Sequence, residues 1–174
     1  MKLTLSTIQK LGISQRISIL SDTIKRANNT FSSDPLNLSH IDVNPCNPNL
    51  VRGFKNYPPD YRMFLEKIGS IMVCTDGYAA LVTCLPILLE NGKEYFDEHE
   101  HYIPLWGIDD INVPKSHVAV ASYPCGYDAI GYDISESPYE LVSLGVYDQG
   151  DSFLEFVEFE FAENPTLSTF YLDK

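Results

Sequence analysis

The sequence predicts an α+β protein in which an antiparallel β-sheet is flanked by α-helices. The first observation is a helical periodicity of apolar residues, which occurs in residues 14–28, 56–70 and 151–165. The second is a series of short apolar or alternating segments between residues 70 and 148, separated by turn residues. Strands joined by short turns pair antiparallel, and here helices precede and follow them, so the class is α+β.

Length and composition indicate one folded domain. The chain has 174 residues, of which 44% are hydrophobic and 21% charged. We therefore treat residues 1–174 as a single domain, with an N-terminal helix and irregular extension (1–56) and a core (57–165). No apolar run is long enough to cross a bilayer, and the N-terminus lacks the features of a secretory signal. We expect a cytoplasmic protein that does not bind a membrane.

The first helix is predicted over residues 14–28, because its apolar residues are three and four positions apart. This apolar face comprises Ile17, Leu20 and Ile24. Asn28 and Asn29 mark the end of the helix. Residues 29–56 contain three prolines and many Asn and Ser residues, which predicts a long irregular connection on the domain surface.

A second helix, in residues 56–70, has the strongest local signal. Pro58 and Pro59 suit a first helical turn, and Asp60 places a negative charge at the helix N-terminus. Gly69 is a natural residue for the position just after the helix. The apolar stripe comprises Tyr61, Phe64, Leu65 and Ile68.

Strands are expected on both sides of the turn dipeptide Asp76-Gly77 and in four later segments. The expected strands are Ser70–Asp76, Tyr78–Leu85, Tyr102–Trp106, His117–Tyr123, residues 126–135 and Tyr139–Asp148. Residues 151–165 suit a helix, and in part a strand. Ser152 followed three positions later by Glu155 is a capping-box pattern, so we predict a helix there.

The segment from Cys125 to Pro138 repeats Gly-Tyr-Asp, and three catalytic interpretations of it fail. A phosphate-binding loop needs a Lys and a Ser or Thr at fixed positions before a helix, and the segment has neither residue at those positions and lies between expected strands. Asp128 and Asp133 are five positions apart, which points them to opposite faces of one strand and argues against an acid–base pair. Cys125 has no nearby His in the sequence. We expect no enzyme activity and no cofactor.

A second cluster has ligand-type side chains. His99 and His101 alternate with Glu98 and Glu100, but the sequence offers no third-ligand motif that would complete a metal site. We prefer an exposed acidic loop to a metal site or to a hydrolase built on these histidines.

Several motifs in order resemble the SUKH superfamily (Smi/Knr-type domain). The segment Tyr57 to Gly69, with the letters YPPDYRMFLEKIG, is similar to the Pro-Asp-Tyr start and Phe-Leu helix of that family. The Gly126-Tyr127-Asp128 motif follows, then Asp133, and the Ser152–Phe156 segment is similar to the closing helix of that family. The resemblance covers residues 57–160 and implies a helix followed by an antiparallel sheet.

The resemblance also implies a function. Bacterial SUKH proteins are mostly immunity proteins that bind and silence a cognate toxin of a polymorphic toxin system, and those toxins are frequently nucleases. Eukaryotic relatives act in regulation, so the alternative is a regulatory or scaffolding module that binds a protein without a toxin partner.

Charge is unevenly distributed along the chain. Residues 1–93 carry ten Lys/Arg and seven Asp/Glu, whereas residues 94–174 carry two and seventeen. Such an acidic half repels nucleic acid and anionic membrane and attracts a basic protein. On charge alone, solubility is the simpler explanation.

We expect the partner, a basic toxin, to contact tyrosines and carboxylates of this acidic half. The tyrosines of the repeat are either core packing or part of this surface. The candidate partner-binding residues are Tyr127, Asp128, Tyr132, Asp133, Glu136, Asp148, Asp151 and Glu155.

Overall fold

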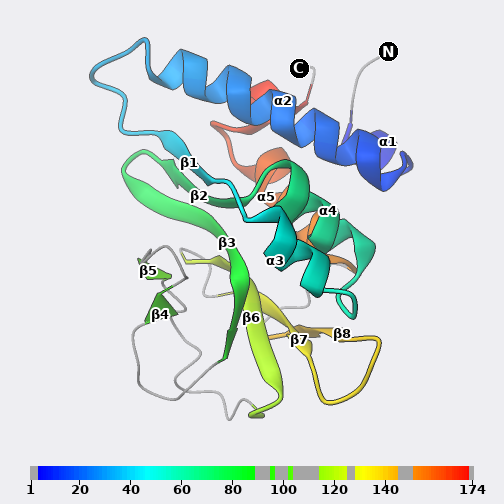
Figure 1. Ribbon diagram of the computed structural model, residues 1–174. Coiled ribbons are helices and arrows are strands. Elements are labelled where there is room, and N and C mark those ends of the chain that lie inside the picture. The colour runs from blue at the N-terminus through cyan, green and yellow to red at the C-terminus, as the bar shows by residue number, and fades with distance from the viewer. Residues whose placement is uncertain are drawn as a thin grey trace.

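The computed structural model describes residues 4–88, 95–96, 102–103, 114–124, 128–144 and 151–172, and it confirms the predicted α+β class. Six strands form one antiparallel sheet in the order β1-β2-β3-β6-β7-β8, and helices pack against it (Figure 1). The helices are α1 (Leu5–Ile8), α2 (Ile13–Phe31), α3 (Pro48–Gly53), α4 (Pro59–Lys67), α5 (Phe153–Glu163) and α6 (Ser168–Tyr171). The strands of the sheet are β1 (His40–Asn44), β2 (Ser70–Thr75), β3 (Tyr78–Leu88), β6 (His117–Tyr123), β7 (Asp128–Asp133) and β8 (Glu140–Ser143). A separate pair is formed by β4 (Tyr95–Phe96) and β5 (Tyr102–Ile103).

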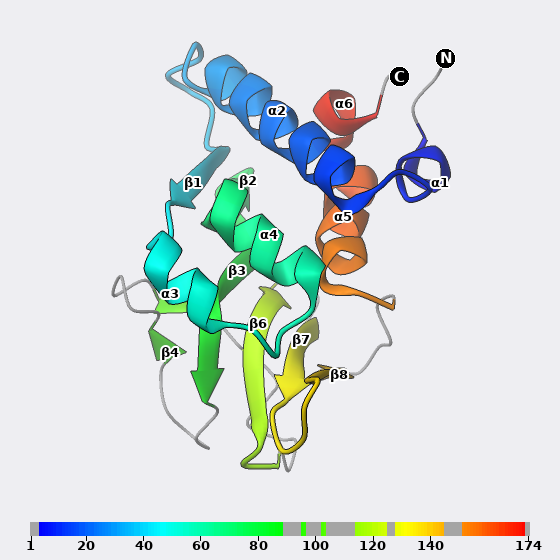
Figure 2. The same cartoon turned by 45° about the vertical axis from the view of Figure 1, so that its right-hand side comes forward.

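The main core lies between one face of the sheet and the helices. Helix α4 packs against α5, and α2 lies across α4 and α6 (Figure 2). Aromatic side chains of α4 and α5 meet here: the rings of Tyr61 and Phe153 are 4.8 Å apart, and those of Phe64 and Phe153 are 5.1 Å apart. Such edge-to-face pairs add to the free energy gained from burying the apolar rings. These ring contacts pack α5 against α4.

The opposite face of the sheet carries a second, smaller apolar cluster. Its buried residues are Val82, Cys84, Ala119, Ala129 and Leu144. Gly131 lies among them, and a Cβ there would be 1.9 Å from the Val118 carbonyl oxygen and 2.8 Å from Leu144 Cδ1. Only glycine fits this close approach of β7 to β6.

The prediction for residues 14–56 was wrong in two respects. Helix α2 does not end at Asn28 but continues to Phe31. The expected irregular connection contains β1 and α3. The Asn and Pro residues that favour loops also mark where these elements begin and end. Pro45 follows the last residue of β1. At the start of α3, the Asn47 side chain accepts a hydrogen bond from the Asn49 amide, and Pro48 occupies the first turn.

The helix and turn predictions around the sheet were confirmed. Helix α4 begins at Pro59, and Gly69 after it has φ +101°, where an added Cβ would lie 2.1 Å from the Asn44 carbonyl oxygen. Asp76 and Gly77, with φ of 52° and 81°, connect β2 to β3. Strand β3 extends beyond its predicted end to Leu88.

The later strands begin and end close to their predicted positions. Strand β6 has the predicted bounds. Strands β5, β7 and β8 lie inside longer predicted segments, whose residues 104–106, 126–127 and 145–148 lie outside the described chain. Helix α6 was not predicted.

Helix α5 confirms the interpretation of residues 151–165 as a helix. The Ser152 side chain accepts a hydrogen bond from the Glu155 amide at 3.2 Å. The Glu155 carboxylate in turn accepts from the Asp151 amide at 2.9 Å, one residue before the position that a standard capping box uses. The Glu155 carboxylate is therefore held at the start of the helix by the Asp151 backbone.

Candidate protein-binding surface

The eight candidate residues do not form one surface. Tyr127 and Asp148 lie outside the described residues. Tyr132 is 0% exposed and Asp128 is 5% exposed, so the prediction that these two contact a partner from the surface was wrong. Tyr132 faces the main core together with Ile130, because residues two positions apart on β7 share a face, and its ring centroid lies 5.6 Å from that of Tyr61.

Asp133 has a structural role at the end of β7. Its carboxylate lies 3.7 Å from His117 Nε2 on the neighbouring strand and accepts a hydrogen bond from the Ser135 amide at 2.9 Å. The Ser135 hydrogen bonds, more than the nearby imidazole, hold the pKa of Asp133 below its ordinary value. As the odd spacing predicts, Asp128 and Asp133 lie on opposite faces of β7. Asp133 therefore organises the β7–β8 loop.

An exposed ridge on α5 includes two of the predicted residues. We define the α5 ridge as Asp151, Glu155, Phe159 and Glu163, which are spaced four residues apart. Glu155, Phe159 and Glu163 therefore lie along one side of α5, and Asp151 directly precedes the N-cap residue Ser152. Asp151, Phe159 and Glu163 are exposed and Glu155 is partly exposed. Phe159 leaves 42% of its surface exposed between the carboxylates of Glu155 and Glu163.

Sequence analysis missed Phe159 and Glu163 as candidates. The four-residue spacing from Glu155 was a usable signal, because it separates Phe159 from the buried face of α5. That buried face includes Phe153, Phe156, Val157 and Phe161. Phe159 lies outside this buried stripe and does not belong to either core cluster.

Local stability explains Asp151 and Glu155 at the N-terminus of α5, but it does not explain Glu163. Glu163 lies in the last turn of α5, which has no basic residue, and the partial negative charge of the helix C-terminus repels a carboxylate there. The cost is about 0.3–1 kcal/mol. Residues that break a local rule without a structural benefit are frequent at binding sites. The exposed aromatic side chain between carboxylates makes the ridge the candidate protein-binding surface.

Two buried carboxylates hold α5 in place beneath the ridge. Asp60 at the start of α4 accepts a hydrogen bond from the Leu154 amide at 3.0 Å. Glu158 accepts from Arg16 Nε at 2.9 Å and from Arg16 Nη2 at 2.6 Å. These contacts fix the first turn and the middle of α5 relative to α4 and α2, so the ridge lies on an anchored helix.

Glu160 lies on α5 next to the ridge but is partly buried. Burial raises its pKa to about 7, against the opposing effect of a hydrogen bond from Asn164 Nδ2 at 2.7 Å. The Asn164 amide nitrogen also lies 3.2 Å from Thr75 Oγ1 on β2. Glu160 thus belongs to a polar contact between α5 and the sheet rather than to the exposed surface.

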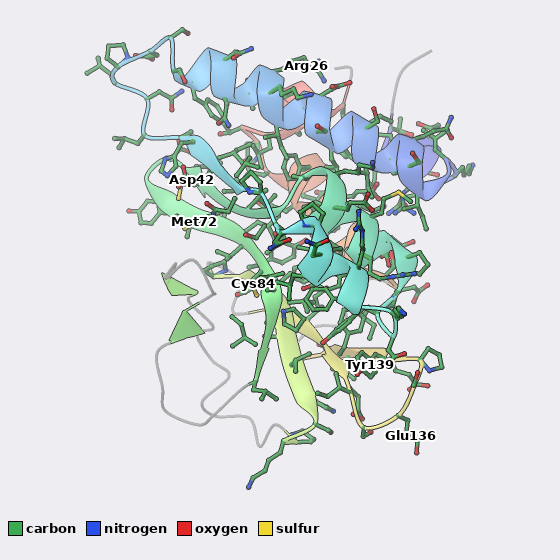
Figure 3. All side chains as sticks on the ribbon, viewed as in Figure 1. Arg26, Asp42, Met72, Cys84, Glu136 and Tyr139 are labelled. Atoms are coloured by element: carbon green, nitrogen blue, oxygen red, sulfur yellow. The ribbon has the colours of Figure 1, made fainter. Side chains whose placement is uncertain are left out.

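A second exposed acidic area lies at the β7–β8 corner. Glu136 and Glu140 are exposed, and Figure 3 shows Glu136 projecting from the loop away from the helices. No lysine or arginine lies between Lys115 and Lys174. The predicted residue Glu136 is therefore available to a partner.

The described part of the chain offers no evident metal site. No group of three or more His, Cys, Asp or Glu side chains among these residues could hold a metal ion. His99 and His101 lie outside the described ranges. Among the described helices, none combines the length and the apolar character needed to span a bilayer.

Comparisons with known proteins give no relative: no protein-family model, no curated protein and no solved structure matches this chain.

Proposed function

We propose that this chain is a SUKH-like immunity protein that acts in the cytoplasm by binding and neutralising a basic toxin, with a nuclease as the favoured class. The observation that carries the proposal is the α5 ridge, in which Phe159 lies exposed between carboxylates at four-residue spacing. Tightly binding interfaces concentrate their free energy in a few aromatic anchors, and surrounding charges steer the partner and set specificity. The motif order from residue 57 to 160 supports the choice of family.

The charge of the ridge suits a nuclease as the partner. Nucleases bind phosphates through lysine and arginine side chains, and an acidic surface can pair with those same side chains. Helix α5 carries four glutamates and no basic residue, and one of them, Glu158, is neutralised internally by Arg16. Occupation of the basic phosphate-binding surface would exclude the nucleic acid. This mechanism requires no catalytic residue in the immunity protein.

The test is capture of the partner from the cells that produce both proteins. The tagged chain is immobilised, partners are eluted with rising salt, and they are identified by mass spectrometry. A basic toxin domain released at moderate salt is the expected result, because screening weakens charge pairs at an exposed interface. Recovery of regulatory or cell-envelope proteins alone would contradict the toxin assignment and favour a regulatory module.

A further inference from the structure

The two edges of the six-stranded sheet differ in how their outward backbone groups are satisfied. At the β1 edge, the side-chain amide of Asn28 bonds both outward groups of Ile41: Nδ2 donates to the carbonyl oxygen at 2.8 Å, and the Ile41 amide donates to Oδ1 at 3.0 Å. Two positions beyond Val43, Pro45 has no N–H to offer. Asn28 and Pro45 therefore leave little of this edge for another strand.

Among the residues that the structure describes, none pairs with the outward backbone groups in the middle of β8. The Leu144 amide donates to the Ala129 carbonyl of β7 at 2.8 Å, so alternate residues back to Glu140 face β7. Leu141 therefore directs its N–H and C=O away from the sheet, and these groups make no hydrogen bond within the part of the chain that the structure describes. The Tyr139 amide, two positions earlier, also points outward and donates to the Asn56 carbonyl oxygen at 3.0 Å.

The charged residues at the β8 edge determine which kind of strand could pair with it. Glu140 lies on β8 itself, Glu136 lies on the loop before it, and both are exposed. Figure 2 shows β8 and β1 on opposite sides of the molecule. A second copy of this chain would bring its own Glu136 and Glu140 to the same edge, and like charges across paired strands are destabilising. An extended segment with lysine or arginine side chains would instead meet opposite charge.

We propose that the β8 edge receives an extended, lysine- or arginine-bearing segment of the partner protein, which adds to the sheet as a further strand. This inference rests on the proposed function, because it takes the partner to be basic. Main-chain hydrogen bonds to Leu141 hold the segment, and Glu140 selects cationic side chains opposite it. The edge site is separate from the α5 ridge, so each can be tested alone.

The probe is a short synthetic peptide of alternating lysine and valine, and its matched control alternates glutamate and valine. Amide hydrogen exchange of the intact chain is followed by NMR at Leu141 and, as the internal reference, at Val43 on the β1 edge. We expect the cationic peptide to slow exchange at Leu141 roughly tenfold and to leave Val43 unchanged, with the effect lost at high salt. No change at Leu141, equal slowing at Val43, or the same effect with the anionic peptide would overturn the inference.

Two variants sharpen the test. Leu141→Pro removes the outward N–H together with the partly buried Leu141 side chain, and it should abolish peptide binding. Because this variant has no amide at position 141, binding is followed by the chemical-shift changes of the remaining amides. The double variant Glu136→Lys, Glu140→Lys keeps every backbone donor and should weaken binding of the cationic peptide at least about tenfold. Asp42→Lys on β1 should leave this binding unchanged. The charge variant decides the outcome if the proline variant fails to fold. If the charge variant binds the peptide as well as the wild type does, the edge inference is overturned, even where a basic toxin is captured. If the capture experiment yields no basic protein, the proposed function is overturned.

Discussion

Arg16 and Glu158 are 142 positions apart in the sequence and form a doubly hydrogen-bonded ion pair inside the protein. The distances are 2.9 Å from Arg16 Nε to Glu158 Oε1 and 2.6 Å from Nη2 to Oε2, and the Glu158 side chain is fully buried. The pair joins α2 to α5, so the helix that carries the α5 ridge is fixed by a contact from the opposite end of the chain.

Removal of one partner of this pair should be costly. We expect Arg16→Met to lower the free energy of unfolding by about 3–5 kcal/mol, because it leaves the Glu158 carboxylate buried without its counter-charge. The double variant Arg16→Met, Glu158→Leu should recover much of that loss, since no buried charge remains. Urea unfolding of the three proteins measures both values. Equal destabilisation by the single and double variants would show that packing, not charge, determines the effect.

Gly131→Ala should destabilise the sheet. The added Cβ would lie 1.9 Å from the Val118 carbonyl oxygen, so β6 and β7 would have to separate. We expect a loss of roughly 2 kcal/mol or more in the free energy of unfolding. Gly53→Ala is the matched control, because nothing lies within 4 Å of a Cβ at that position and alanine restricts the unfolded chain. A neutral Gly131→Ala together with a destabilising Gly53→Ala would contradict the described packing.

Glu160 should make stability depend on pH near neutrality. Its pKa rises from the ordinary 4.5 to about 7 in the folded protein, because burial disfavours the carboxylate. A raised carboxyl pKa means that the folded state holds its proton more tightly than the unfolded state. This contribution to stability is complete below pH 4.5 and is lost as the pH rises to about 7.

Glu160→Gln removes this titration. Relative to the variant, the wild-type protein should lose roughly 2–3 kcal/mol of unfolding free energy between acidic and mildly alkaline pH. Urea unfolding across that range measures the difference, and Glu163→Gln on the exposed ridge serves as the control. Parallel pH profiles for wild type and Glu160→Gln would rule out a raised pKa at Glu160.

Asn28→Ala should expose the β1 edge. The variant loses two hydrogen bonds to Ile41, with an expected cost of about 1–2 kcal/mol in unfolding free energy. The Ile41 amide should exchange faster, which NMR detects residue by residue. Asn29→Ala is the control, since this neighbouring side chain is exposed on the same helix. Unchanged exchange at Ile41 would mean that the side-chain amide does not protect the edge.

Helix α4 was predictable because its information is local. Prolines begin it, an apolar stripe covers one face, and Gly69 occupies a positive-φ position after it. Strand β1 was not predictable from its own residues, since only pairing with β2 makes it a strand. Asn and Pro residues around it suit loops and caps equally.

The candidate surface was predictable only in part. The alternation of side chains along a strand correctly predicted that Asp128 and Asp133 lie on opposite faces of β7. The sequence does not say which of these faces meets the helices. Asp128 was therefore assigned to the surface although the structure buries it. Phe159 was overlooked among the several phenylalanines of α5, although its four-residue spacing from Glu155 separates it from the buried face of the helix.

The central claim is that the α5 ridge binds a basic protein, and association kinetics with the captured partner test it most directly. The variant Phe159→Ala, Glu163→Lys leaves the α5 N-cap intact, and Tyr78→Ala, Glu66→Lys makes matched changes at exposed positions elsewhere. We predict that the ridge variant associates more slowly and dissociates faster, with a loss of at least about a hundredfold in affinity, whereas the control stays within about twofold of wild type. Equal affinities for wild type, ridge variant and control would contradict the claim.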